Sequence, residues 1–173
     1  WGNPFMNIGD ASIVNLNHEA FHLYQYNGGV AYGGDSGWFI EDSANWYAAG
    51  RNPNDKWNFV GASSLVHHPQ LPIWHSGFFN LEDGEEHNWG RGMHQYGMNT
   101  FFNYMTCLKG VSGNVIGSSF YVGSGLTPQK YLFDTIGADR FKKYWLEFIS
   151  QMAGDYGFLS KEQAEIAEGE WQQ

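Results

Sequence analysis

The sequence predicts a mainly α-helical protein with little or no β-sheet, formed by a single domain over residues 1–173. Three observations support this fold class. The length suits one domain with a real core, apolar residues recur at helical spacing in several segments, and no segment shows a convincing strand pattern. Aromatic residues make up 18% of the chain and charged residues only 16%, a composition that argues against disorder.

The first helix is expected after an irregular segment over residues 1–9. Asp10 can cap its amino-terminal end, and Gly28-Gly29 end it. Its apolar residues follow helical spacing: Ile13, Leu16, Ala20 and Leu23.

A second helix is expected after a glycine-rich loop over residues 27–34. It starts near Asp35-Ser36, either of which can cap it, and ends at Gly50. The loop lets the chain reverse, so the second helix can pack antiparallel on the first.

The middle of the chain is expected to be mostly irregular. Residues 51–88 contain prolines, glycines and scattered aromatics, which predict loops with one short helix over 60–67. A helix is expected over 89–109, and its apolar residues are Phe101, Phe102, Met105 and Leu108. The Gly/Ser-rich segment 111–125 predicts a loop or a short pair of strands.

Two further helices are expected toward the carboxy-terminal end. Thr127-Pro128 opens the first, because proline suits the first turn of a helix. A longer helix spans 138–153, and its apolar stripe consists of Phe141, Tyr144, Trp145, Phe148, Ile149 and Met152. Residues 161–173 carry four glutamates and predict a solvated terminal helix.

Charge and cysteine content exclude several classes of function. The formal net charge is −9, and the chain has only three arginines, which argues against a nucleic-acid partner. No apolar run approaches the roughly 18 residues that a membrane span needs. The single cysteine, Cys107, excludes an internal disulfide and a multi-cysteine zinc site, and it is expected to be a small buried hydrophobe rather than a nucleophile.

The segment His18-Glu19-Ala20-Phe21-His22 has the pattern H-E-x-x-H. On a helix, residues four apart share one face, about 6 Å apart along the axis, so two imidazoles can bind one Zn²⁺. Glu19 points to the side of this pair and can serve as the general base for a water molecule. The competing interpretation is a buried structural histidine pair with a hydrogen-bonded glutamate.

Glu41 is the expected third ligand, because a catalytic zinc site uses three protein ligands and one open position. It follows His22 after 18 intervening residues, on the second helix. Asn45, one turn later, is expected to orient a ligating histidine from outside the ligand set. Asp42, the next residue, is the alternative candidate for the third ligand; if Glu41 is the ligand, Asp42 is expected to lie next to the ligand set without binding the ion. The alternative role for Glu41 is an ordinary surface or helix-capping carboxylate.

These motifs resemble the gluzincin clan of zinc metallopeptidases, and their spacing is similar to that of its aminopeptidase branch. The resemblance covers HEAFH, the 18-residue interval, and the setting W-F-x-E-x-x-A-x-W around Glu41. It implies a zincin-like helical catalytic subdomain, similar to the carboxy-terminal half of the clan's catalytic domain. It also implies one Zn²⁺ held by His18, His22 and Glu41, with Glu19 as the base.

The chain departs from the gluzincin pattern in two ways. Gluzincins build a β-sheet before the zinc helix, whereas only 17 residues precede His18 here. The chain is therefore expected either to be a fragment of a longer protein or to hold its substrate differently. In the first case, the missing upstream part of the same protein is an expected partner of this chain. The aminopeptidase motif Gly-x-x-Glu-Asn is absent from the sequence, so aminopeptidase activity is not expected.

Other residues offer weaker candidates. Tyr96 and His94 are candidate donors to the oxyanion of peptide hydrolysis, although core or surface roles are the ordinary alternative. The segment His94-Gln95-Tyr96-Gly97 is also similar to one in secreted gluzincin-like domains. A second metal site could be formed by His67, His68 and His75, although exposed loop histidines are the ordinary alternative. A Ca²⁺ site could be formed by the acidic run Glu82, Asp83, Glu85 and Glu86, which is otherwise a solvated loop. An aromatic platform could be formed by five tryptophans that are otherwise core residues: Trp38, Trp46, Trp57, Trp74 and Trp89.

The expected function is zinc-dependent hydrolysis of a protein or peptide substrate by an extracellular, secreted protein. The compositional basis for the compartment is the low lysine content, the 23 glycines and the lack of a thiol pair. Two alternatives remain open at this point. One is a catalytically silent zincin-like module that binds protein or glycan in an extracellular assembly, and the other is a purely structural helical domain.

Overall fold

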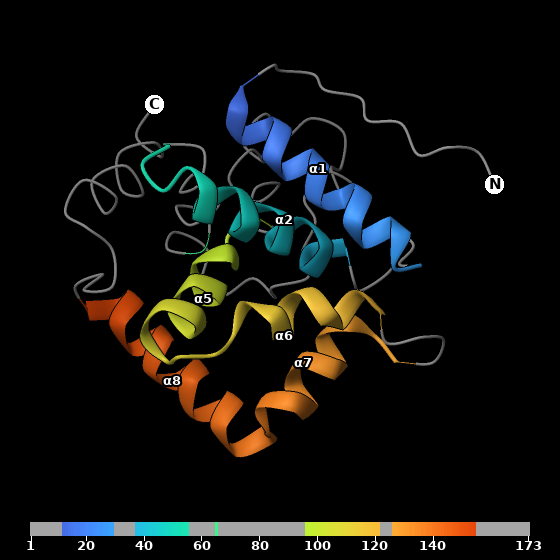
Figure 1. Ribbon diagram of the computed structural model, residues 1–173. Coiled ribbons are helices and arrows are strands. Elements are labelled where there is room, and N and C mark those ends of the chain that lie inside the picture. Colours follow the sequence, from blue (N-terminus) through green and yellow to red (C-terminus); the bar gives the residue numbers. More distant parts are fainter. Residues whose placement is uncertain (1–11, 30–36, 56–64, 66–95, 122–125, 155–173) are drawn as a thin grey trace, which may run out of the picture.

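The computed structural model describes residues 12–29, 37–55, 65, 96–121 and 126–154. These residues form six α-helices, a π-helical turn and a 3₁₀ turn, and they contain no β-strand (Figure 1). The mainly α-helical fold class is thereby confirmed for this part of the chain. None of the helices in these ranges is long and apolar enough to cross a membrane.

Helix α1 (Ile13–Asn27) begins later than the sequence predicts. Ser12, not Asp10, is its N-cap: the Ser12 hydroxyl accepts a hydrogen bond from the backbone N–H of Asn15 at 3.2 Å. The chain leaves the helix at Gly28, where a Cβ atom would lie only 2.3 Å from the carbonyl oxygen of Phe120. A glycine is therefore required where the end of α1 meets the 3₁₀ turn.

The buried face of α1 is not the apolar row identified in the sequence. Ile13 and Leu16 are 58% and 38% exposed, and Ala20 is exposed too. The buried residues are Val14, His18, Phe21, His22 and Gln25. Helix α1 turns its histidines inward because their partners lie on the neighbouring helix.

Helix α2 (Gly37–Arg51) lies beside α1 and runs in the opposite direction (Figure 1). The start near residue 35 and the end near Gly50 agree with expectation to within two residues, although Asp35 and Ser36 lie outside the described residues. Ala44 and Ala48 are fully buried, and their small side chains permit the close approach of the two helices. This antiparallel pair carries the candidate site.

Residues 89–95 of the helix expected over 89–109 lie outside the described residues, and within 96–109 the helix begins only at Asn99. Helix α5 (Asn99–Asn103) continues into a π-helical turn (Tyr104–Leu108), and residues 96–98 are not α-helical. The start of α5 is set by a tertiary contact, since the Asp42 carboxylate on α2 accepts the backbone N–H of Asn99 at 3.0 Å. Cys107 lies in the π-helical turn and is exposed, so its expected burial is wrong.

The prediction of a loop or strand pair over 111–125 is also wrong where the structure describes it. The chain forms helix α6 (Gly113–Ser118) and a 3₁₀ turn (Ser119–Tyr121). The Ser112 hydroxyl caps α6 by accepting the Asn114 N–H at 3.3 Å. Ile116 and Phe120 are buried in the core, and this burial outweighs the weak helix propensity of the Gly/Ser-rich sequence.

Helices α7 (Pro128–Ile136) and α8 (Ala138–Gly154) agree with the sequence prediction. Thr127 is the N-cap of α7, and Pro128 occupies the first turn. On α8, Phe148 is fully buried, while four other stripe residues pack partly buried against the core: Phe141, Tyr144, Trp145 and Met152. Ile149 lies at the edge of the stripe and is 38% exposed.

An aromatic core connects the site helices to the rest of the molecule. In Figure 1, α5 and α6 lie between the α1–α2 pair and helices α7 and α8. Phe39 on α2 contacts both Phe102 and Phe120, with ring centroids 5.3 and 5.8 Å apart. Phe101 in turn contacts Phe148 on α8 at 5.1 Å. Burial of these rings supplies much of the apolar area that stabilises the fold and holds α2 in place.

Candidate metal centre

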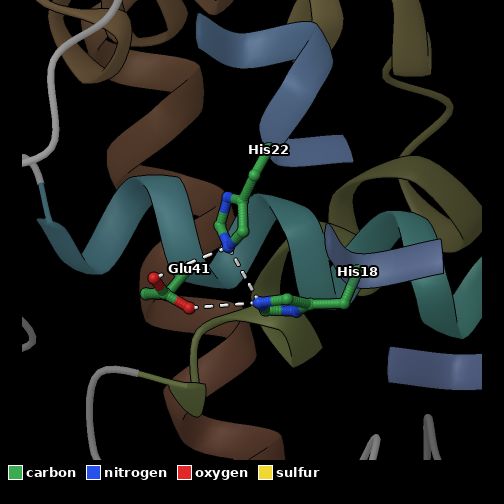
Figure 2. A group of neighbouring side chains, drawn as sticks. All are labelled: His18, His22 and Glu41. Carbon is green, nitrogen blue, oxygen red and sulfur yellow. Dashed lines mark hydrogen bonds and ion pairs between the residues drawn. The ribbon is translucent and has the colours of Figure 1, made fainter. Parts of the chain in front are cut away.

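The side chains of His18, His22 and Glu41 converge on one buried point (Figure 2). The Nε2 atoms of the two histidines are 2.9 Å apart. Oε2 of Glu41 lies 3.2 Å from Nε2 of His18, and Oε1 lies 3.6 Å from Nε2 of His22. One ligand atom from each residue lies within 4.8 Å of the other two, so this group could hold a metal ion.

Local and tertiary structure each supply part of this arrangement. The i,i+4 spacing on α1 places both imidazoles on its buried face. Their rings stand nearly perpendicular, at 88° with centroids 4.6 Å apart, so the two Nε2 atoms can approach the same point from different directions. The antiparallel packing of α2 brings Glu41 to them.

The electrostatics of the group also favour a cation. Burial raises the pKa of Glu41, but hydrogen bonds and charge interactions with His18 and His22 outweigh burial and lower this pKa to about 2. Burial lowers the pKa of His22, but Glu41, Gln25 and Glu19 outweigh burial and raise it. Glu41 is therefore a carboxylate at neutral pH, and the group attracts positive charge.

The donor set fits a divalent metal. Two imidazoles and one carboxylate leave a fourth tetrahedral position open, which is the composition of catalytic zinc sites. The two Nε2 atoms lie 2.9 Å apart, close enough for a single cation beside them to contact both. The sequence prediction of a metal site at these three residues is thus supported in its geometry, whereas the identity of the ion stays a prediction.

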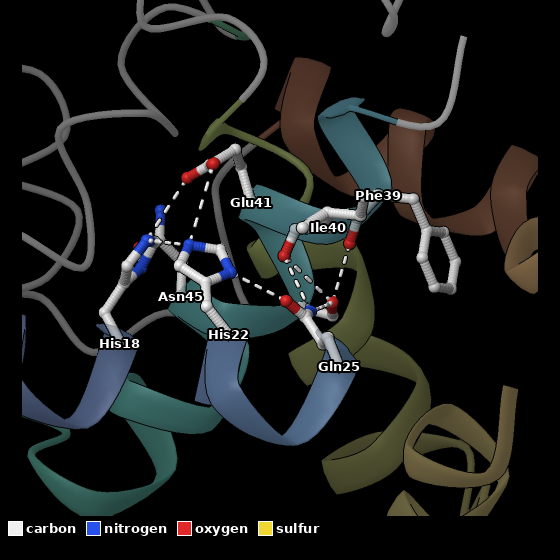
Figure 3. A network of polar contacts seen from close by, with 8 residues as sticks. His18, His22, Gln25, Phe39, Ile40, Glu41 and Asn45 are labelled. Carbon is white, nitrogen blue, oxygen red and sulfur yellow. Dashed lines mark hydrogen bonds and ion pairs between the residues drawn. The ribbon is translucent and has the colours of Figure 1, made fainter. Parts of the chain in front are cut away.

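Two amide side chains contact the outer nitrogens of the histidines (Figure 3). Nδ1 of His18 lies 2.7 Å from Oδ1 of Asn45, as the spacing of Glu41 and Asn45 suggests. Nδ1 of His22 lies 2.6 Å from Oε1 of Gln25. Gln25 was not predicted from the sequence, although its position three residues after His22 places it on the same helix face.

Glu19 lies on α1 between the two histidines and is half-buried. It does not belong to the ligand group, but its charge raises the pKa of His22. Tyr26, which was also not predicted from the sequence, stacks on the His22 ring with centroids 6.0 Å apart. Burial raises the pKa of Tyr26, and the charges of Glu41 and Glu19 raise it further, so both carboxylates act near this ring.

Tyr96 and Asp42 occupy different surroundings. The Tyr96 ring lies beside His18, with centroids 6.5 Å apart, which places this candidate oxyanion donor next to the site. Asp42 is outside the ligand group and binds the start of α5 instead. Burial raises its pKa well above the ordinary value, an effect that hydrogen bonds from Asn99 and Met98 reduce but do not cancel.

Several weaker candidates lie outside the described residues. They include the candidate oxyanion donor His94 and the other loop histidines, His67, His68 and His75. They also include the acidic run Glu82, Asp83, Glu85 and Glu86, and three of the tryptophans, Trp57, Trp74 and Trp89. The two described tryptophans of the suggested platform, Trp38 and Trp46, pack against the core.

Comparisons with protein-family models, with curated proteins and with solved structures find no match to this chain.

Proposed function

We propose that this chain is a zinc-dependent peptide hydrolase with a gluzincin-like site. His18, His22 and Glu41 hold the ion, and Glu19 is the general base. The observation that carries this proposal is the buried convergence of two Nε2 atoms and a carboxylate, with Glu19 on the same helix as the two histidines.

The chemistry divides between the ion and the chain. When bound, a divalent ion supplies Lewis acidity, which lowers the pKa of a water molecule toward about 7 and polarises the scissile carbonyl. Glu19 accepts the proton of the attacking water and returns it to the leaving amine. Tyr96, beside His18, is the proposed donor to the developing oxyanion.

Metal analysis of the purified chain tests the site. One zinc per chain is expected, and His18→Ala should abolish it. No stoichiometric metal after zinc is supplied would overturn the site and leave the histidine pair as a structural feature.

Glu19→Gln tests the reaction. We expect this variant to keep its zinc and to lose hydrolysis of an unfolded protein substrate. Glu147→Gln is the matched control, because Glu147 lies on α8 and pairs with Lys109, and it should retain activity. Zinc binding without any hydrolysis by the wild-type chain would contradict the enzymatic proposal and support a silent binding module. Activity that persists in Glu19→Gln would overturn the assignment of the base.

A further inference from the structure

Gln25 is a polar residue with 0% exposure in the contact between α1 and α2. Its amide makes three short contacts (Figure 3). Oε1 lies 2.6 Å from Nδ1 of His22, while Nε2 donates to the carbonyl oxygen of Ile40 at 2.9 Å and to the Ser43 hydroxyl at 2.8 Å. A fully buried amide with all these partners is held in one orientation.

The partners on α2 determine which end of the amide faces His22. A backbone carbonyl only accepts hydrogen bonds, so the group next to Ile40 must be the NH₂. The Ser43 hydroxyl donates to the Phe39 carbonyl at 2.6 Å, which leaves its lone pairs to accept from Gln25. The Gln25 oxygen must therefore face His22.

This orientation selects the tautomer of His22. An amide oxygen only accepts, so Nδ1 of His22 must carry a hydrogen. In a neutral imidazole the other nitrogen, Nε2, is then bare. Nε2 is the atom that lies 2.9 Å from Nε2 of His18 and 3.6 Å from Glu41.

On the basis of the metal site proposed above, we infer that Gln25 is a positioning residue that prepares His22 to bind a metal. It holds the Nδ1–H tautomer, so that the lone pair of Nε2 faces the site. The carbonyl that Gln25 binds belongs to the peptide bond between Ile40 and Glu41. One side chain therefore ties a ligand on α1 to the backbone of the ligand on α2.

The tautomer is measurable in the metal-free wild-type protein. Imidazole ¹⁵N chemical shifts of a neutral ring distinguish the two tautomers, so they are recorded at alkaline pH, and His22→Gln identifies the His22 signals. We expect His22 to be the Nδ1–H tautomer. The Nε2–H tautomer as the main form would overturn the inference without any need for a folded variant.

Two variants then test the cause. Gln25→Leu removes the acceptor, so the Nε2–H tautomer should become populated and zinc affinity should fall by about 10- to 100-fold. Ser43→Ala keeps the contacts of Gln25 with His22 and Ile40. In this variant the tautomer of His22 should stay as in wild type, and the affinity for zinc should change by less than about tenfold. A purely structural role would lower the stability of both variants and leave tautomer and affinity unchanged, which would overturn the inference.

Failure of the proposed function is distinguishable from failure of this inference. If His22 is Nδ1–H in wild type and changes in Gln25→Leu, Gln25 controls the tautomer whether or not the wild-type chain binds zinc. If zinc binds to wild type but Gln25→Leu leaves the tautomer unchanged, the metal site stands and the role of Gln25 falls.

Discussion

The carboxylate of Asp42 accepts the backbone N–H of Asn99 at 3.0 Å, across 57 residues of sequence. Asp42 directly follows Glu41 on α2, and Asn99 is the first residue of α5, so this contact joins α2 to the start of α5. It also fixes the backbone three residues beyond Tyr96, whose ring lies beside His18. One hydrogen bond therefore links the helix that carries Glu41 to the segment that carries the proposed oxyanion donor.

Replacement of Asp42 by alanine is expected to destabilise the protein by about 1–3 kcal/mol, because the buried N–H of Asn99 loses this acceptor. Asp42→Asn keeps an acceptor oxygen without charge and should cost less. Urea unfolding curves of the two variants measure the difference. Equal losses of unfolding free energy would show that the hydrogen bond does not stabilise the start of α5.

Asn45 offers a direct test of the contact on His18. Asn45→Leu removes the acceptor for Nδ1 and should weaken zinc binding by about 10- to 100-fold. Asn45→Asp keeps the acceptor and adds negative charge near the cation, so it should bind zinc more tightly than wild type. Competition with a chelator of known affinity measures both. An unchanged affinity in Asn45→Leu would separate this residue from the metal site.

Removal of metal is expected to lower the thermal stability of the protein. A ligand that binds only the folded state stabilises it by about 2.7 kcal/mol at 100 times its Kd, which corresponds to roughly 5–10 °C in Tm at this chain length. Addition of EDTA should reverse the shift, and His22→Ala should show none. Equal Tm values for wild type with zinc and with EDTA would contradict zinc binding to the folded chain.

Gly28→Ala is expected to destabilise the protein by about 1–3 kcal/mol, because its Cβ would lie 2.3 Å from the backbone oxygen of Phe120, which cannot rotate away. Gly50→Ala is the matched control: nothing lies within 4 Å of a Cβ there, and alanine favours the helix. Differential scanning calorimetry measures both. A stable Gly28→Ala variant would show that the 3₁₀ turn can shift away from α1.

The ion pair of Lys109 and Glu147, 2.7 Å apart, predicts a pH dependence away from the site. The hydrogen bond from Lys109 lowers the pKa of Glu147, and the same bond raises the pKa of Lys109 to about 12. Since the carboxyl pKa is lowered by folding, the stabilisation is present above the ordinary glutamate value and is lost as pH falls through the lowered one.

An NMR titration of the Glu147 carboxyl measures this effect. Lys109→Met should raise its midpoint toward the ordinary value. Lys143→Met should have a smaller effect, because Lys143 lies 3.9 Å away and contributes least to the shift. An unchanged midpoint in Lys109→Met would remove this pair as the cause.

Features that depend on neighbours in sequence were predictable. The i,i+4 spacing places His18 and His22 on one helix face, and Thr127-Pro128 starts α7, because both follow from the geometry of a single helix turn. The apolar stripe of α8 could be identified for the same reason. The second helix, which carries the candidate ligand Glu41, followed from the glycine-rich loop and from the spacing of Glu41.

The tertiary structure alone decided the rest, because it depended on contacts between distant segments. Packing against α2 buried the histidine face of α1 and left Ile13 and Leu16 exposed, whatever the apolar periodicity indicated. Asp42 on α2 accepts the N–H of Asn99, the first residue of α5, across 57 residues of sequence. The role of Gln25 required its contact with Ile40 on α2. The sequence by itself determined the local placement of two candidate ligands, whereas packing of α1 against α2 decided how they meet the third, since a hydrogen bond between helices has no signature in the periodicity of either one.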